Sequence, residues 1–354
     1  MTHPIERPRS KAPAVHRFAP LLCALLPLCL AAACAPGEDG SGEPDGHDPG
    51  RPTTMMPNPP APPVPKDALQ LHVGPVDLRA GEERTVCVTR RLPTTEAMNV
   101  SHVATRQTHS HHVIFYRYAP GSKPRENSTP ERCGALDLFD GGTFKIPVFI
   151  GESSDDAQNQ LQLPPGVAYH FGAGDYYTIE MHLLNASPSP AQANADVLLV
   201  PIEKGVPVVY ADMIFANGER TLRKSYDGGG AGIPPMQALT TDPTFAAVSG
   251  EAKIFALTTH QHRFGTDLSI YRSTGVADGG TLLLRNTDWA HPALLRYPDN
   301  APLTFAAGEG MRWVCSYRNT TSNYVTFGSS AETDEMCIIW AYYYPSTGFK
   351  IVWN

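Results

Sequence analysis

The sequence predicts an all-β fold, and three observations lead to this prediction. Pro and Gly number 34 and 30 among 354 residues, about 18% together where about 12% is usual, and both disfavour helix interiors. Short runs rich in β-branched and aromatic residues recur between Gly, Pro, Asn and Asp, as in sandwiches and barrels. No stretch keeps a 3.6-residue apolar period. The predicted strands include Arg84–Thr89, His111–Tyr118, Tyr176–Leu184, Asp196–Ile202, Lys253–Thr259, Thr281–Arg285, Met311–Tyr317 and Cys337–Tyr344.

Residues 1–33 have the pattern of a secretory signal peptide. Four positive side chains precede an apolar run at 18–33, whose 16 residues are too few to span a bilayer comfortably. The run ends in Leu-Ala-Ala-Ala-Cys, which resembles a bacterial lipoprotein cleavage box and predicts lipidation of Cys34, with simple cleavage and secretion as the alternative. We therefore expect an exported protein of a bacterial cell envelope that meets the membrane only through a lipid anchor.

The remaining chain divides into a linker and two domains. Residues 34–66 are rich in Pro and Gly and almost free of large apolar side chains, which predicts a disordered linker. Glu203–Pro207 interrupts the strand pattern near the middle, so we expect a hinge between domains at 67–204 and 205–354. The net charge is −7 and no basic block is present, which disfavours nucleic acid as a partner.

Four of the seven cysteines lie in the two predicted domains. An even number of cysteines in an exported chain predicts disulfides, and four allow three pairings. Proximity within each half of the chain favours Cys87–Cys133 and Cys315–Cys337. Neither pair has a Cys-x-x-Cys spacing, so a thiolate zinc site is not expected.

The first histidine cluster contains His109, His111 and His112, at the polar entry to an apolar strand. Three imidazoles crowded within four residues favour neutral rings that share a metal. Side chains alternate across a strand, so regular geometry alone favours His109 and His111 as a ligand pair. An exposed polar strand end is an equally weighted alternative for this segment.

Three further positions carry metal-ligand chemistry. His182 shares a strand face with Glu180, although a lone histidine in a strand is more often structural. His260 and His262 end an apolar strand two residues apart, so both rings face one side and offer two nitrogens to one metal. Met336 is by default a core thioether, but it is also a soft ligand suited to copper(I).

Four motifs, in order and approximate spacing, resemble the ascorbate-dependent type II copper monooxygenases, the family of peptidylglycine α-hydroxylating monooxygenase and dopamine β-monooxygenase. These motifs are His-His before an apolar run (111–115), Glu-Met-His (180–182), Thr-His-x-His-x-x-Gly (259–265) and Asp-Glu-Met-Cys (334–337). The resemblance spans about residues 69–344 and implies two tandem antiparallel jelly-roll β-sandwich domains. It also implies hydroxylation of an activated C–H bond, in which one oxygen atom of O₂ is incorporated and ascorbate or an equivalent one-electron donor supplies electrons.

The resemblance implies two coppers per chain, held by two separate triads that face each other across a gap. The implied ligands are His111, His112 and His182 for the first copper, and His260, His262 and Met336 for the second, where oxygen reacts. By this resemblance the adjacent residues His111 and His112 are the ligands, in place of the pair His109 and His111 that regular geometry favours. His109 then becomes a neighbour of the site, and the strand must be irregular there. Asp334 and Glu335 are interpreted as residues that hold the turn before Met336.

The resemblance also bears on the substrate. Where peptide-amidating members of the family bind the substrate carboxylate, this chain has Thr258, Ile338 and Trp340. One hydroxyl and two largely apolar groups cannot replace a guanidinium, so an aromatic or apolar small molecule is expected in place of a peptidylglycine. Two alternatives are a copper-binding or copper-buffering lipoprotein without turnover, and a mononuclear zinc hydrolase that uses His260 and His262.

Overall fold

Every regular element in the described part of the chain is a β-strand, which confirms the all-β prediction. The computed structural model describes residues 65–66, 68–140, 142–152, 159–223, 232–248 and 250–353. Within these ranges, no helix is long and apolar enough to span a membrane. The predicted signal, Cys34 and nearly all of the predicted linker lie outside the described residues.

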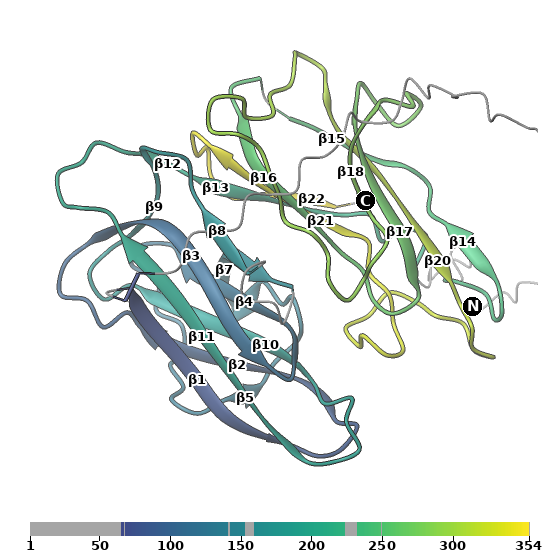
Figure 1. The fold of residues 1–354 in the computed structure, drawn as a ribbon, viewed down its shortest axis with the longest axis horizontal. Helices are drawn as coiled ribbons and strands as arrows, with labels where there is room; N and C mark the ends of the chain where they lie inside the picture. Colours follow the sequence, from purple (N-terminus) through teal and green to yellow (C-terminus); the bar gives the residue numbers. More distant parts are fainter. Residues whose placement is uncertain are drawn as a thin grey trace, which may run out of the picture. The chain divides into compact units, whose positions relative to one another are not determined.

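The N-terminal half, β1–β12, forms two six-stranded sheets, coloured purple to teal in Figure 1. One sheet has the order β1-β11-β3-β9-β12 with β8 beside β3, and the other has the order β5-β2-β10-β4-β7-β6. All pairs are antiparallel except β12 with β9. The strands are β1 (Leu69–Leu78), β2 (Glu83–Arg91), β3 (Met98–Thr108), β4 (Ser110–Tyr118), β5 (Glu131–Arg132), β6 (Phe139–Asp140), β7 (Thr143–Gly151), β8 (Gln160–Gln162), β9 (Val167–Phe171), β10 (Tyr176–Leu184), β11 (Ala191–Pro201) and β12 (Val209–Tyr210).

The C-terminal half, β13–β22, forms two five-stranded sheets, coloured green to yellow in Figure 1. Their orders are β19-β16-β21-β13-β22 and β14-β20-β17-β18, with β15 beside β20. The strands are β13 (Asp212–Asn217), β14 (Ala238–Thr240), β15 (Thr244–Ala247), β16 (Lys253–His260), β17 (Gly265–Ser273), β18 (Thr281–Asn286), β19 (Leu295–Arg296), β20 (Gly310–Arg318), β21 (Ile338–Tyr344) and β22 (Lys350–Trp353).

The chain passes between the halves later than the predicted hinge. Strand β12 still pairs with β9, and the first strand of the C-terminal sheets starts at Asp212. The strand-bearing residues of both halves belong to one compact unit. The predicted division into domains at 204/205 therefore stays a prediction.

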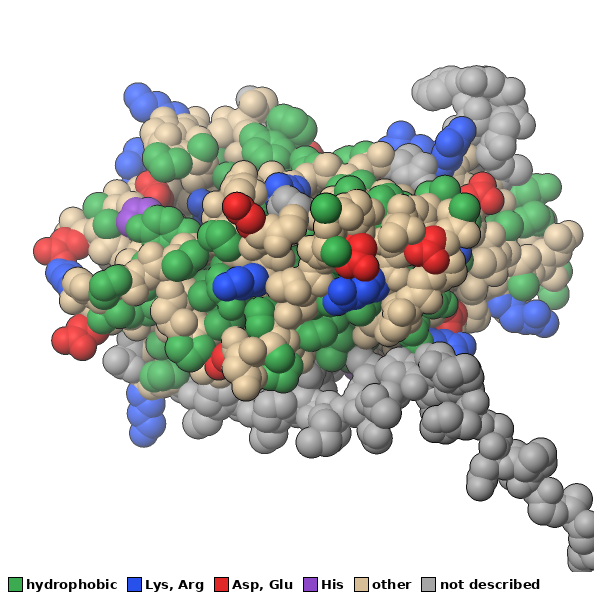
Figure 2. Space-filling model, turned by 90° about the horizontal axis from the view of Figure 1, so that it is seen from above, with side chains coloured by type: hydrophobic (Ala, Val, Ile, Leu, Met, Phe, Trp, Pro, Cys, Tyr) green, Lys and Arg blue, Asp and Glu red, His purple; other side chains and the backbone are tan. Residues whose placement is uncertain are grey.

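The main hydrophobic core contains buried side chains from both halves. It combines residues such as Ile179 and Met181 of β10 with Trp340 and Tyr342 of β21, and a second cluster lies within the C-terminal half. Strand β10 is central in its sheet and buried along almost its whole length, so its alternating polar side chains are also enclosed. On the face seen in Figure 2, positive and negative side chains are interspersed.

Candidate metal centre

An irregular entry to β4 places two adjacent histidines in the same site. His109, between β3 and β4, has a positive φ of 51° and is exposed. Directly after it, the pairing of β4 with β10 shifts register between His182 and Leu183. This irregularity lets His111 and His112 both face other imidazoles, although neighbours on a regular strand point to opposite faces. The preference for His109 and His111 assumed a regular strand, and that assumption is wrong.

Five imidazoles from the two halves lie in one cluster. The ring centroids of His112 and His182 are 4.9 Å apart, and the Nε2 atom of His112 lies 3.2 Å from the Nδ1 atom of His182. The ring of His111 lies 5.4 Å from that of His260. One nitrogen each from His111, His260 and His262 lies within 4.8 Å of the others. The gap expected between two separate triads is absent, because His111 reaches the histidines of the C-terminal half.

Burial keeps four of these rings neutral, those of His111, His112, His260 and His262. His260 and His262 are 0% exposed and His111 is 7% exposed. Burial, reinforced by neighbouring imidazoles, lowers the pKa of His111, His112 and His262 well below the usual value, and lowers the pKa of His260 to about 3. A neutral imidazole keeps one unprotonated nitrogen, which is the form that binds metals.

The free nitrogens of the cluster fit a metal ion. Within the described ranges, the Nε2 atoms of His111, His260 and His262 are buried without a hydrogen-bond partner, as is Nδ1 of His112. The second ring nitrogen is occupied in two of them, since Nδ1 of His260 lies 2.8 Å from Glu152 and Nδ1 of His262 lies 3.2 Å from the Asp334 carbonyl oxygen. Each unpaired buried polar atom costs about 1–3 kcal/mol, which a bound metal would offset. Three imidazole nitrogens suit copper or zinc.

Two carboxylates that the sequence analysis did not identify hold the histidines. Glu152 Oε2 lies 2.8 Å from His260 Nδ1, and burial raises the pKa of Glu152 well above its usual value. Glu83 Oε1 lies 2.8 Å from His182 Nε2. Carboxylates in this position orient metal-binding imidazoles and strengthen them as ligands. Glu83 begins β2 and Glu152 directly follows β7, but no spacing in the sequence links either of them to a histidine.

Glu83 also joins the two halves beside the cluster. It accepts hydrogen bonds from the Ser330 hydroxyl at 2.7 Å and the Ala331 N–H at 2.6 Å. Burial alone would raise its pKa, but the hydrogen bonds from His182, Ser330 and Ala331 outweigh this and lower the pKa to about 2. The carboxylate is therefore ionised at neutral pH. Trp289, also absent from the sequence analysis, places its ring 5.6 Å from that of His111.

Glu335 connects the His262 loop to Met336. Its buried carboxyl accepts hydrogen bonds from the backbone N–H groups of His262 (3.0 Å), Phe264 (2.7 Å) and Met336 (3.2 Å). Burial raises its pKa to about 8, although these backbone bonds oppose the shift. Met336 is buried in the main hydrophobic core, and its role as a copper ligand stays a prediction.

The remaining predicted residues occupy buried or bridged positions. Thr258, Ile338 and Trp340 are all buried, and the Trp340 ring packs 4.7 Å from that of Phe215, so their contact with a substrate stays a prediction. The structure contains both predicted disulfides, Cys87–Cys133 and Cys315–Cys337.

Residues 235–352 match the family model described as copper type II ascorbate-dependent monooxygenase, C-terminal domain. This match confirms the resemblance for the segment that contains His260, His262 and Met336. No curated protein matches the chain. Solved structures similar to it include the major capsid protein P2 from bacteriophage PM2 (TM-score 0.31, 11% identity, 80% of this chain and 100% of that one) and PNGF-II (TM-score 0.29, 10% identity, 78% and 64%). Likenesses this low say nothing of function.

Proposed function

We propose that this chain is a copper-dependent monooxygenase that hydroxylates an activated C–H bond of an aromatic or apolar small molecule, with O₂ and a one-electron donor such as ascorbate. One observation carries the proposal: three buried, unpartnered imidazole nitrogens converge, and two of them belong to the segment that matches the copper monooxygenase family. Copper bound there would supply one-electron chemistry with O₂.

The chain's own residues would hold and shield that centre. The free nitrogens of His111, His260 and His262 lie close together and would bind the copper. The burial of these residues keeps water out of the site. Glu152 fixes the ring of His260 through its Nδ1 atom, so that Nε2 points into the cluster. Glu83 holds the ring of His182 through the opposite nitrogen, Nε2, so that Nδ1 faces His112.

We propose two coppers per chain, as the resemblance implies. The three nitrogens that converge within 4.8 Å belong to His111, His260 and His262. His112 and His182 are therefore left to bind a second ion, and His111 would lie beside both ions. The soft thioether of Met336 would then belong to the ion at His260 and His262, where it would favour copper(I).

Metal analysis combined with oxygen uptake tests the proposal. We expect the purified protein to hold two coppers and to couple O₂ consumption to ascorbate oxidation. His182→Ala should lose one copper, whereas Met336→Ile should keep both and lose most oxygen uptake. A single zinc bound with equal affinity by all three proteins would refute the copper assignment.

A second candidate is a copper-binding protein without turnover. The burial of the imidazoles favours it, because a C–H substrate must reach atoms that the folded chain encloses. The two candidates differ in one measurement: a copper-buffering protein would bind copper tightly and show no ascorbate-dependent O₂ consumption above free copper.

We also propose that the protein is exported and lipid-anchored through Cys34, with no other membrane contact. The support is the signal-like pattern of residues 1–34. Mass spectrometry of the N-terminal peptide from a bacterial expression host tests this, since a Cys34→Ser variant should lose both the lipid mass and the membrane fraction.

A further inference from the structure

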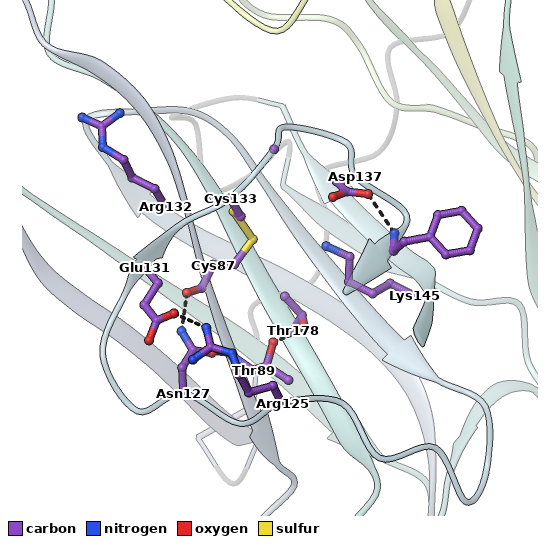
Figure 3. Close-up of a pocket in the computed structure, with 12 residues that line it drawn as sticks. Cys87, Thr89, Arg125, Asn127, Glu131, Arg132, Cys133, Asp137, Lys145 and Thr178 are labelled. Atoms are coloured by element: carbon purple, nitrogen blue, oxygen red, sulfur yellow. Dashed lines mark hydrogen bonds and ion pairs between the residues drawn. A yellow bond between two sulfur atoms is a disulfide. The ribbon is translucent and has the colours of Figure 1, made fainter. Parts of the chain in front are cut away.

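A pocket lies on the sheet that carries His112 and His182. It has a volume of about 180 Å³ and is lined in part by Thr89 on β2, Thr178 on β10 and Lys145 on β7 (Figure 3). Pockets for drug-sized ligands are about 300–1,000 Å³, so this one suits a smaller molecule. Thr178 and His182 lie four residues apart on β10, which places them on one face of the sheet about 13 Å apart.

Lys145 contributes a positive charge to the lining of this pocket. The residue is 2% exposed, and its ammonium lies 4.8 Å from the centre of the Tyr116 ring. Within the described residues its ammonium makes no hydrogen bond or ion pair. The nearby carboxylate of Glu180 attracts it electrostatically but is bonded to the Tyr116 hydroxyl at 3.0 Å and the Leu136 N–H at 2.8 Å. Lys145 lines the pocket, so its three ammonium donors can bind an anionic ligand there.

The rest of the lining suits a ligand that also carries hydroxyl groups. In Figure 3, Asp137 enters the pocket on the same side as Lys145, and the Arg125–Glu131 ion pair enters on the other side. One oxygen of Asp137 accepts the Phe139 N–H at 2.9 Å, which leaves the other for a ligand hydroxyl. Carboxylates repel a simple anion but accept hydrogen bonds from a polyhydroxylated one.

We propose that this pocket binds the ascorbate monoanion as the electron donor, with Lys145 holding its anionic enolate oxygen and Asp137 a hydroxyl. This inference rests on the proposed function. Reduction of one copper(II) to copper(I) would take one electron from one ascorbate monoanion, which releases one proton to water and leaves as the radical anion. The pocket is therefore a donor site separate from the metal cluster.

Calorimetry of the metal-free full chain with ascorbate, under argon, tests binding without copper chemistry. We expect one ascorbate per chain, and at least about a tenfold loss of affinity in Lys145→Met, which removes a charge-assisted hydrogen bond and keeps the apolar stem. The matched control is Lys253→Met, which removes an exposed lysine 5.7 Å from the Tyr344 ring and should change nothing. Asp137→Ala, at an exposed position, should weaken binding several-fold and gives a second variant should Lys145→Met fail to fold.

Three results would overturn the assignment: no ascorbate binding, unchanged affinity in every folded pocket variant, or equal affinity for gluconate, a polyhydroxylated anion that is a poor reductant. Steady-state oxygen uptake separates this inference from the proposed function. If uptake is normal and Lys145→Met leaves the KM for ascorbate unchanged, the pocket assignment fails and the monooxygenase proposal stands. If ascorbate binds with the expected variant pattern but no copper-dependent uptake occurs, the monooxygenase proposal fails, and with it the role of the pocket as a donor site.

Discussion

The contact between Glu152 and His260 allows a sharp test of the metal centre. Glu152 is 4% exposed, and its carboxylate lies 2.8 Å from the only ring nitrogen of His260 that has a hydrogen-bond partner. Glu152→Gln keeps the size of the side chain and replaces the carboxyl group by an amide, which cannot ionise to strengthen a metal-bound imidazole. Loss of a carboxylate behind a metal-bound imidazole typically lowers metal affinity about 10–100-fold, or about 1.4–2.7 kcal/mol.

The assay is competition for copper(I) against a chelator of known affinity, with wild type and variant measured side by side. Glu332→Gln is the matched control. Glu332 pairs with the exposed Arg263, the residue that follows His262, and among the described residues it contacts no histidine of the cluster. We expect the control to stay within about twofold of wild type. The role of Glu152 in metal affinity is refuted if Glu152→Gln also stays within twofold, or if both variants lose affinity equally.

Three further predictions concern stability, each measured by urea unfolding of the metal-free protein. Glu83→Ala should lower the unfolding free energy by about 2–4 kcal/mol, because Ser330, Ala331 and His182 lose their shared acceptor; a loss under 1 kcal/mol would contradict this. Replacing Cys315 and Cys337 by Ser should cost about 3 kcal/mol, from the sequence separation of 22 that the bridge closes, and equal stability with and without a reductant would refute it. Because burial lowers the pKa of His260 to about 3, its neutral form stabilises the fold fully above about pH 6.5, and this contribution is lost as the pH falls. Between pH 7.5 and 5.5, wild type should lose about 1.4 kcal/mol more than His260→Gln, and parallel pH profiles of the two proteins would count against burial of a neutral ring.

The agreement between sequence and structure is closest where local pattern decides. Each of the eight predicted strands overlaps an observed strand, and Tyr176–Leu184 matches β10 at both ends. Alternation and β-branched content mark such strands because a pleated backbone presents successive side chains to opposite faces. Strands such as β3 and β7 are not among these eight, because they carry polar residues or Pro within them. Their place in the sheets follows from pairing with distant strands.

Local pattern in the sequence sufficed to predict the strand-rich class, the favoured cysteine pairs and the histidines of the candidate metal centre. Tertiary structure decided how those histidines meet: a positive φ at His109 turns that residue outward, and the register shift after it sends His111 to His260 and His262. Tertiary structure also brought Glu83 and Glu152 to the imidazoles and buried Lys145 beside a pocket. The physical reason is range, since strand pattern is written in neighbouring residues, whereas these contacts join residues about 70 to 250 positions apart.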